Sequence, residues 1–141
     1  MPPKSIKLYW NEKNVNSGDV LKVLFGDRKD TLAAARLLIT RMKANQNLAM
    51  TKRELRFFAK ELQSGKSGVK YSYHNFYTKL LRKLLDLGFI DRNVLIWDAK
   101  RRKTAAVYQL RLQAISERPP QGGFVKQTWQ LARGWNELVA K

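Results

Sequence analysis

The sequence predicts an α+β domain of three helices and a β-hairpin. Apolar residues recur at helical spacing in three segments between residues 31 and 87. Two short segments between residues 94 and 112 are rich in β-branched and aromatic residues, which is typical of paired strands. Pro and Gly mark the break that follows. We therefore expect an N-terminal extension (1–29), this domain (30–118), and a linker with a C-terminal amphipathic helix (119–141).

The extension has the weakest pattern. Residues 6–10 suggest a short strand, and residues 14–18 suggest a turn. Residues 20–25 are apolar and fit either a strand or a helical turn, which ends at Gly26.

Two helices follow the extension. Asp30 is a suitable N-cap for a helix over residues 31–44, after which residues 48–50 are expected to be extended. A capping box, Thr51 with Glu54, predicts the start of the second helix. The apolar faces of the two helices comprise Leu32, Ala35, Leu38, Ile39 and Met42 in the first, and Leu55, Phe58, Ala59 and Leu62 in the second.

A third helix is expected over residues 72–87, ending at Gly88. At 100° per residue, one arc holds Tyr73, Phe76, Tyr77, Leu80, Leu84 and Leu87, and the opposite arc holds Asn75, Thr78, Lys79, Arg82 and Asp86. The aromatic residues of the first arc are expected in the core, where side chains at this spacing usually lie.

The hairpin pairs residues 94–97 with residues 105–112, and Tyr108, Leu110 and Leu112 are expected to share one face. Four successive cations, Lys100 to Lys103, lie at its tip. The tail beyond the Pro-Gly linker predicts a helix with Trp129, Ala132, Trp135 and Leu138 on one side. This side either packs the tail onto the domain or forms a homodimer through Trp129, Trp135 and Leu138.

The composition points to a polyanionic partner. The chain of 141 residues has 28 Lys+Arg against 11 Asp+Glu, a net charge of +17, and residues 51–103 alone contribute +9. The absence of cysteine and the single histidine argue against a metal site or a cofactor. Carboxylates are few and scattered, so we do not expect an enzyme. The first residues lack the apolar core of a signal peptide and no apolar run is long enough to span a membrane, which suggests a cytoplasmic protein.

The order of elements resembles the winged helix-turn-helix superfamily. The resemblance is carried by residues 51–62, residues 72–87, the junction Leu84-Leu85-Asp86-Leu87-Gly88-Phe89-Ile90, and the hairpin over 94–112. One departure is the turn over residues 63–71, which is longer than the usual three or four residues. The resemblance implies a double-stranded DNA-binding protein, a nucleoid-associated transcription regulator of a prokaryote, an archaeon or a mobile element.

In this interpretation the helix over residues 72–87 enters the major groove and a basic wing (98–104) lies on the backbone. Asn75 is suited to an adenine edge, Arg82 to a guanine, and Lys79 and Lys83 to phosphates. The full set of expected nucleic-acid contacts is Lys52, Arg53, Arg56, Lys66, Lys70, Tyr71, Ser72, Asn75, Thr78, Lys79, Arg82, Lys83, Lys100, Arg101, Arg102 and Lys103.

Two RNA-binding interpretations remain open. The Gly-x-x-Gly sequence at residues 65–68 lies between two helices, as in KH domains that clamp single-stranded RNA. The other RNA-binding interpretation is a winged helix that forms part of a ribonucleoprotein. The same residues do not form a nucleotide-binding P-loop, because the required earlier glycine is Lys60 and no buried strand precedes it.

Overall fold

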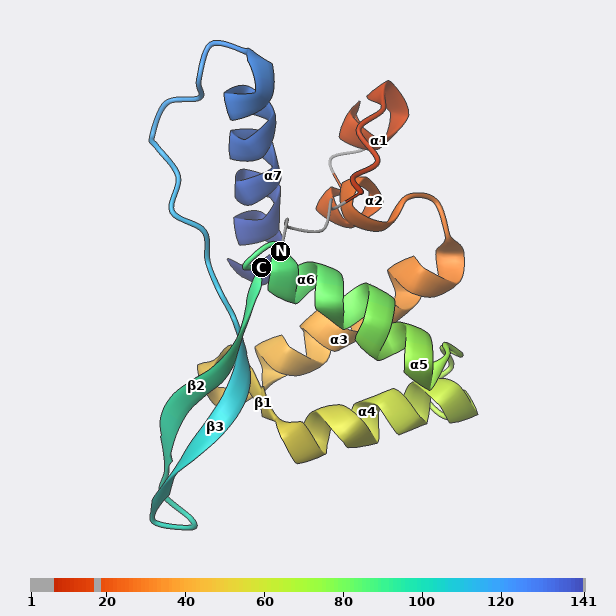
Figure 1. The fold of residues 1–141 in the computed structure, drawn as a ribbon, viewed down its shortest axis with the longest axis vertical. Coiled ribbons are helices and arrows are strands. Elements are labelled where there is room, and N and C mark those ends of the chain that lie inside the picture. The colour runs from red at the N-terminus through yellow and green to blue at the C-terminus, as the bar shows by residue number, and fades with distance from the viewer. Residues whose placement is uncertain (1–6, 17–18, 141) are drawn as a thin grey trace, which may run out of the picture. The chain divides into compact units, whose positions relative to one another are not determined.

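The computed structural model describes residues 7–16 and 19–140 and shows an α+β chain with a three-stranded antiparallel sheet (Figure 1). The backbone forms two compact units. One is residues 28–111, and the other joins residues up to 27 with residues from 112 onward. Residues 28–111 thus lie, in sequence, between the two segments that form the other unit.

The first unit begins with α3 (Lys29–Ala44), which matches the expected helix. Its N-cap is Arg28, so the expectation of Asp30 at that position was wrong; Asp30 lies in the first turn, where its carboxylate accepts the Thr31 N–H. The predicted apolar face is buried, including Leu38 and Met42 at 0% exposure. A short turn, η1 (Gln46–Leu48), leads into β1 (Ala49–Thr51), so Leu48 is not part of the strand.

α4 (Lys52–Ser64) begins at the predicted capping box and ends at Gly65, whose φ of 77° is the left-handed conformation that glycine tolerates. Its apolar face is buried as expected. Phe58 of this face packs edge-on against Phe76 of the next helix, with 5.5 Å between ring centroids.

The third helix runs continuously through α5 (Tyr73–Asn75), η2 (Phe76–Leu81) and α6 (Arg82–Asp86). The middle segment, η2, is a π-helix, which the sequence pattern did not predict. Its wider turn brings Leu80 and Leu81, neighbours in sequence, both into the core at 0% and 2% exposure. Tyr73 and Tyr77 are only partly buried, so they differ from the core positions expected for them.

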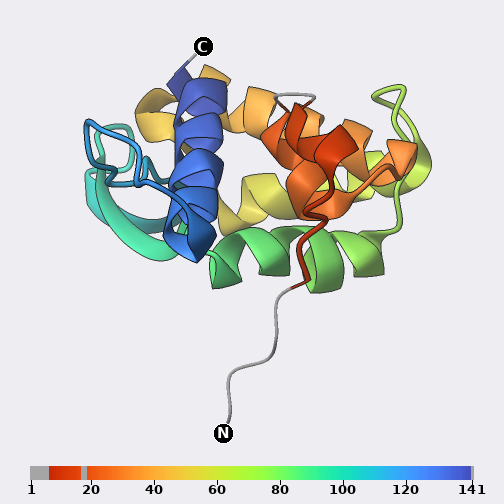
Figure 2. The same cartoon turned by 90° about the horizontal axis from the view of Figure 1, so that it is seen from above.

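The hairpin consists of β2 (Ile90–Asp98) and β3 (Lys103–Leu110), and β3 is the central strand because it also pairs with β1. The register is interrupted between Asp91 and Val94, where Asn93 has a φ of 59°. Leu112 lies beyond β3 and is 55% exposed, so the expected shared face of Tyr108, Leu110 and Leu112 was wrong at this residue. Figure 2 shows the hairpin at one end of α4 and the loop after α4 at the other.

The second unit contains α1 (Glu12–Asn16), α2 (Val20–Phe25) and α7 (Gly123–Ala140). The expected strand over residues 6–10 is absent from residues 7–10, and residues 14–16 are helical where a turn was predicted. Ile6, Ser17 and Gly18 lie outside the described residues. Residues 20–25 form the helical alternative and end at Gly26 as expected.

The buried face of α7 is Leu131, Trp135 and Val139, which shares only Trp135 with the expected face. Trp135 is 0% exposed, so its ring packs within the chain. A glycine at position 134 of the helix is explained by close packing, because a Cβ there would lie 3.2 Å from Val20 Cβ of α2. The Asn136 amide also ties α7 to the segment that follows β3, by accepting the Gln113 N–H at 2.7 Å and donating to the Gln113 carbonyl at 2.9 Å.

Candidate nucleic-acid interface

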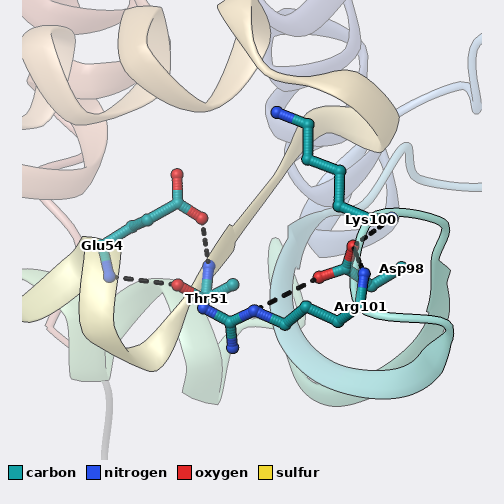
Figure 3. Close-up of polar contacts among 5 residues, drawn as sticks. All are labelled: Thr51, Glu54, Asp98, Lys100 and Arg101. Carbon is teal, nitrogen blue, oxygen red and sulfur yellow. Dashed lines mark hydrogen bonds and ion pairs between the residues drawn. The ribbon is translucent and has the colours of Figure 1, made fainter.

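The first turns of α4 present exposed cations beside the hairpin. Thr51 Oγ1 accepts the Glu54 N–H, and Glu54 Oε1 accepts the Thr51 N–H, both at 3.1 Å (Figure 3). This capping box fixes the helix start, and Thr51 pairs with Val107 of the central strand. Lys52, Arg53 and Arg56 are exposed on the turns that follow. The sheet pairing therefore places these predicted contacts next to the hairpin.

The tip of the hairpin is organised by Asp98. Its Oδ1 accepts the N–H groups of Lys100 at 3.1 Å and Arg101 at 3.3 Å, and its Oδ2 lies 3.9 Å from Arg101 Nε (Figure 3). Lys100, Arg101, Arg102 and Lys103 are all exposed. One carboxylate thus partly offsets the charge of the tip, and the remaining cations face solvent.

The third helix presents part of the predicted polar face. Ser72 caps the helix, because its Oγ accepts the Asn75 N–H at 3.2 Å. Thr78 and Lys79 are exposed, whereas Asn75 and Lys83 are partly buried. Thr78 Oγ1 donates to the His74 carbonyl at 2.8 Å.

Arg82, expected to contact a guanine, lies 3.6 Å from Asp86 through its Nε. Both side chains are about half exposed, at 54% and 43%, so water screens this ion pair. Reading a base would require Arg82 to exchange this contact for one with the nucleic acid.

Tyr71 is buried, unlike most of the predicted contacts. Its side chain is 6% exposed, and its N–H donates to the Leu62 carbonyl at 2.9 Å. A side chain buried to this extent argues against the expected phosphate contact.

Lys66 and Lys70 are exposed, but they lie in the loop after α4, at the opposite end of that helix from the hairpin (Figure 1). A 13-residue helix is about 20 Å long, which separates these two cations from those of the tip and the helix start. Gly65 and Gly68 of the same loop have positive φ angles of 77° and 87°.

Two surface features were not predicted from the sequence. Leu95 and Trp97 of β2 are 71% and 65% exposed, and their register partners, Ala106 and Thr104, are exposed as well. Lys60 continues the line of Lys52 and Arg56 at four-residue spacing on α4. Residues 94–97 form a continuous apolar run in the sequence, and which of its two faces the core covers depends on the strand pairing.

Comparisons of the chain with protein-family models, curated proteins and solved structures give no match. Among the residues that the structure describes, no group of three His, Asp or Glu side chains is placed to hold a metal ion. In the same part of the chain, none of the helices has the length and apolarity needed to cross a membrane.

Proposed function

We propose that residues 28–111 form a winged helix-turn-helix domain that binds double-stranded DNA and regulates transcription. The order α3, β1, α4, the helix over 73–86, β2 and β3 is the order of that fold, and the sheet order β1-β3-β2 is compatible with it. The hairpin then acts as the wing and the helix over 73–86 as the recognition helix.

One observation carries the proposal: cations gather at the start of α4 and at the neighbouring hairpin. Lys52 and Arg53 lie at the positive end of the α4 dipole, where a cation is disfavoured by about 0.3–1 kcal/mol. Exposed cations of the tip add to the same positive potential. Phosphates bound across this surface would offset the repulsion and release counterions.

Within this arrangement each group has a distinct role. Lys52, Arg53 and Arg56 hold phosphates, as do the four cations of the tip. Asn75 and Lys79 are the candidates for base edges in the major groove, since Arg82 is engaged with Asp86. The exposed Trp97 face next to the cationic tip supplies an apolar contact to sugars or to the floor of a minor groove.

Selection of bound sequences from a random duplex library tests the proposal. We expect an enriched motif whose affinity falls steeply with salt, because up to about seven phosphate contacts give a slope near −6 in log K against log salt. A palindromic motif would indicate a dimer on DNA. The proposal would be rejected if no motif is enriched and if the chain binds duplex DNA no more tightly than it binds an uncharged competitor.

The second candidate is single-stranded RNA binding by the loop over residues 65–68. Its two glycines with positive φ and its exposed Lys66 favour this function over a purely structural turn. A single-stranded RNA in the same salt series separates the two functions. Tighter binding of RNA than of duplex DNA, lost on Gly68→Asp, would replace the DNA proposal with this one.

A further inference from the structure

A pocket of about 300 Å³ opens beside the start of α4 and is lined by Lys52, Leu55, Arg56, Tyr73, Tyr77 and Tyr108. We call it the tyrosine pocket. Its residues come from α4, from the recognition helix and from the central strand β3, so the three elements of the proposed interface converge on it. The proposed contacts to duplex DNA use its two cations but leave its three phenols without a role.

The pocket offers both aromatic surface and hydrogen-bond donors. The rings of Tyr73 and Tyr77 lie 5.1 Å apart, centroid to centroid, with 56° between their planes. Burial, then the neighbouring Tyr73 through its charge and a hydrogen bond, raises the pKa of Tyr77 to about 12. The Tyr77 hydroxyl therefore stays protonated at neutral pH.

The lining defines the chemistry of the ligand. Lys52 and Arg56 are exposed cations that suit a phosphate, whereas the tyrosine rings suit a flat aromatic group. An aliphatic ligand would use only Leu55. The volume is at the lower end of the range of about 300–1,000 Å³ for small-ligand pockets, which fits one nucleotide better than a larger molecule.

We propose that the tyrosine pocket binds a single nucleotide, with its base against the tyrosine rings and its phosphate beside Lys52 and Arg56. This inference rests on the proposed nucleic-acid binding and extends it from a regular duplex to one unpaired nucleotide. The nucleotide is either free or part of a strand. Tyr73 also lines a second hollow of about 460 Å³ with Lys60, Gln63 and Ser64, where a neighbouring nucleotide of a strand would fit.

The test compares two labelled duplexes that differ by one unpaired dT at the centre, with the full-length chain and fluorescence anisotropy. We expect the duplex with the unpaired dT to bind roughly 5- to 140-fold more tightly, the range that stacking of one base on an aromatic side chain provides. Competition by dTMP distinguishes a free nucleotide from a nucleotide within a strand as the ligand of the pocket. Displacement of the bulged duplex supports free nucleotides as ligands, and its absence supports a nucleotide within a strand.

Variants link the preference to the pocket. Tyr77→Ala is expected to remove the difference between the duplexes, whereas Phe57→Ala is expected to keep it, because Phe57 is 58% exposed on α4 outside the pocket lining. Circular dichroism checks that both variants are folded. Photocrosslinking of the unmodified chain, with 5-iododeoxyuridine in place of the unpaired dT, gives an independent readout that needs no variant.

Crosslinks to Tyr73, Tyr77 or Tyr108 would support the proposal, and crosslinks confined to other residues would overturn it. Equal affinity for the two duplexes would also overturn it while leaving the proposed function intact. Binding to neither duplex would reject both.

Discussion

Replacing Arg101 and Arg102 together by alanine tests whether the hairpin tip contacts phosphates. The change should leave the tip folded, because Asp98 holds it through the backbone N–H groups of Lys100 and Arg101, which alanine keeps. The lost ion pair between Arg101 and Asp98 is long, at 3.9 Å, and exposed to solvent. Such pairs contribute at most about 1 kcal/mol.

The expected magnitude follows from counterion release. Each phosphate contact contributes about 0.9 to the slope of log K against log salt, so losing two contacts lowers the slope by up to about 1.8. Over a fourfold rise in salt, the native chain should therefore lose about 12-fold more affinity than the variant. Arg101 contributes less than a full contact if it keeps its ion pair with Asp98.

The assay is anisotropy of a labelled duplex at several salt concentrations. The matched control is Arg118→Ala with Lys126→Ala, two exposed cations of the other unit that lie outside the proposed interface. The control removes the same net charge and should keep the native slope. A slope equal to the native value in the Arg101 and Arg102 variant, or the same decrease in the control, would refute the role of the tip.

Three further predictions concern single side chains. Asn75→Ala should cost about 1–3 kcal/mol of binding on the selected duplex and little on a scrambled one; an equal loss on both would make Asn75 a positioning contact. Thr51→Ala should lower the free energy of unfolding in urea by about 1 kcal/mol, because it removes the capping box. The control is Thr40→Ala, because the Thr40 hydroxyl only donates to the Arg36 carbonyl within α3; this change should alter the free energy of unfolding by less than about 0.5 kcal/mol. An equal loss in both variants would contradict the cap assigned to Thr51. For Tyr77, the folded pKa near 12 exceeds the ordinary value of 10, so an unfolded chain releases this proton first and stability should fall as the pH rises from 10 to 12. Between pH 10 and 12 the melting temperature should fall less for Tyr77→Phe than for the native chain. Identical pH dependence in both proteins would show that Tyr77 does not ionise as described.

The parts of the fold that could be predicted from the sequence have strong local signals. α3 and α4 carry regular apolar spacing, and the capping box fixes the start of α4 at Thr51. Gly88, with a φ of 77°, ends the recognition helix where expected. These features depend on neighbours within a few residues, so the chain reveals them without knowledge of the tertiary structure.

The parts that could not be predicted depend on distant partners. α7 buries Leu131 and Val139 because it packs within a unit that includes α2, and no pattern in the sequence indicates that these two helices share a unit. The π-helical segment over residues 76–81 buries Leu81 in addition to the predicted Leu80, which a fixed rotation of 100° per residue did not indicate.

The same limit applies to the candidate site. The exposed cations of α4 and of the tip are visible in the sequence, but Tyr71 looked exposed and is buried, while Tyr73 and Tyr77 looked buried and line a pocket. Aromatic side chains at helical spacing usually lie in a core, but they also suit a binding surface. The packing of β3 against the helices decides between them.

The most direct measurement is an NMR titration of the isotope-labelled chain with the selected duplex, following each backbone amide. We expect the shifts to concentrate in residues 52–56, 75–83 and 98–103, and residues 123–140 to stay unchanged. Shifts confined to residues 65–70, or to α7, would contradict the proposed interface.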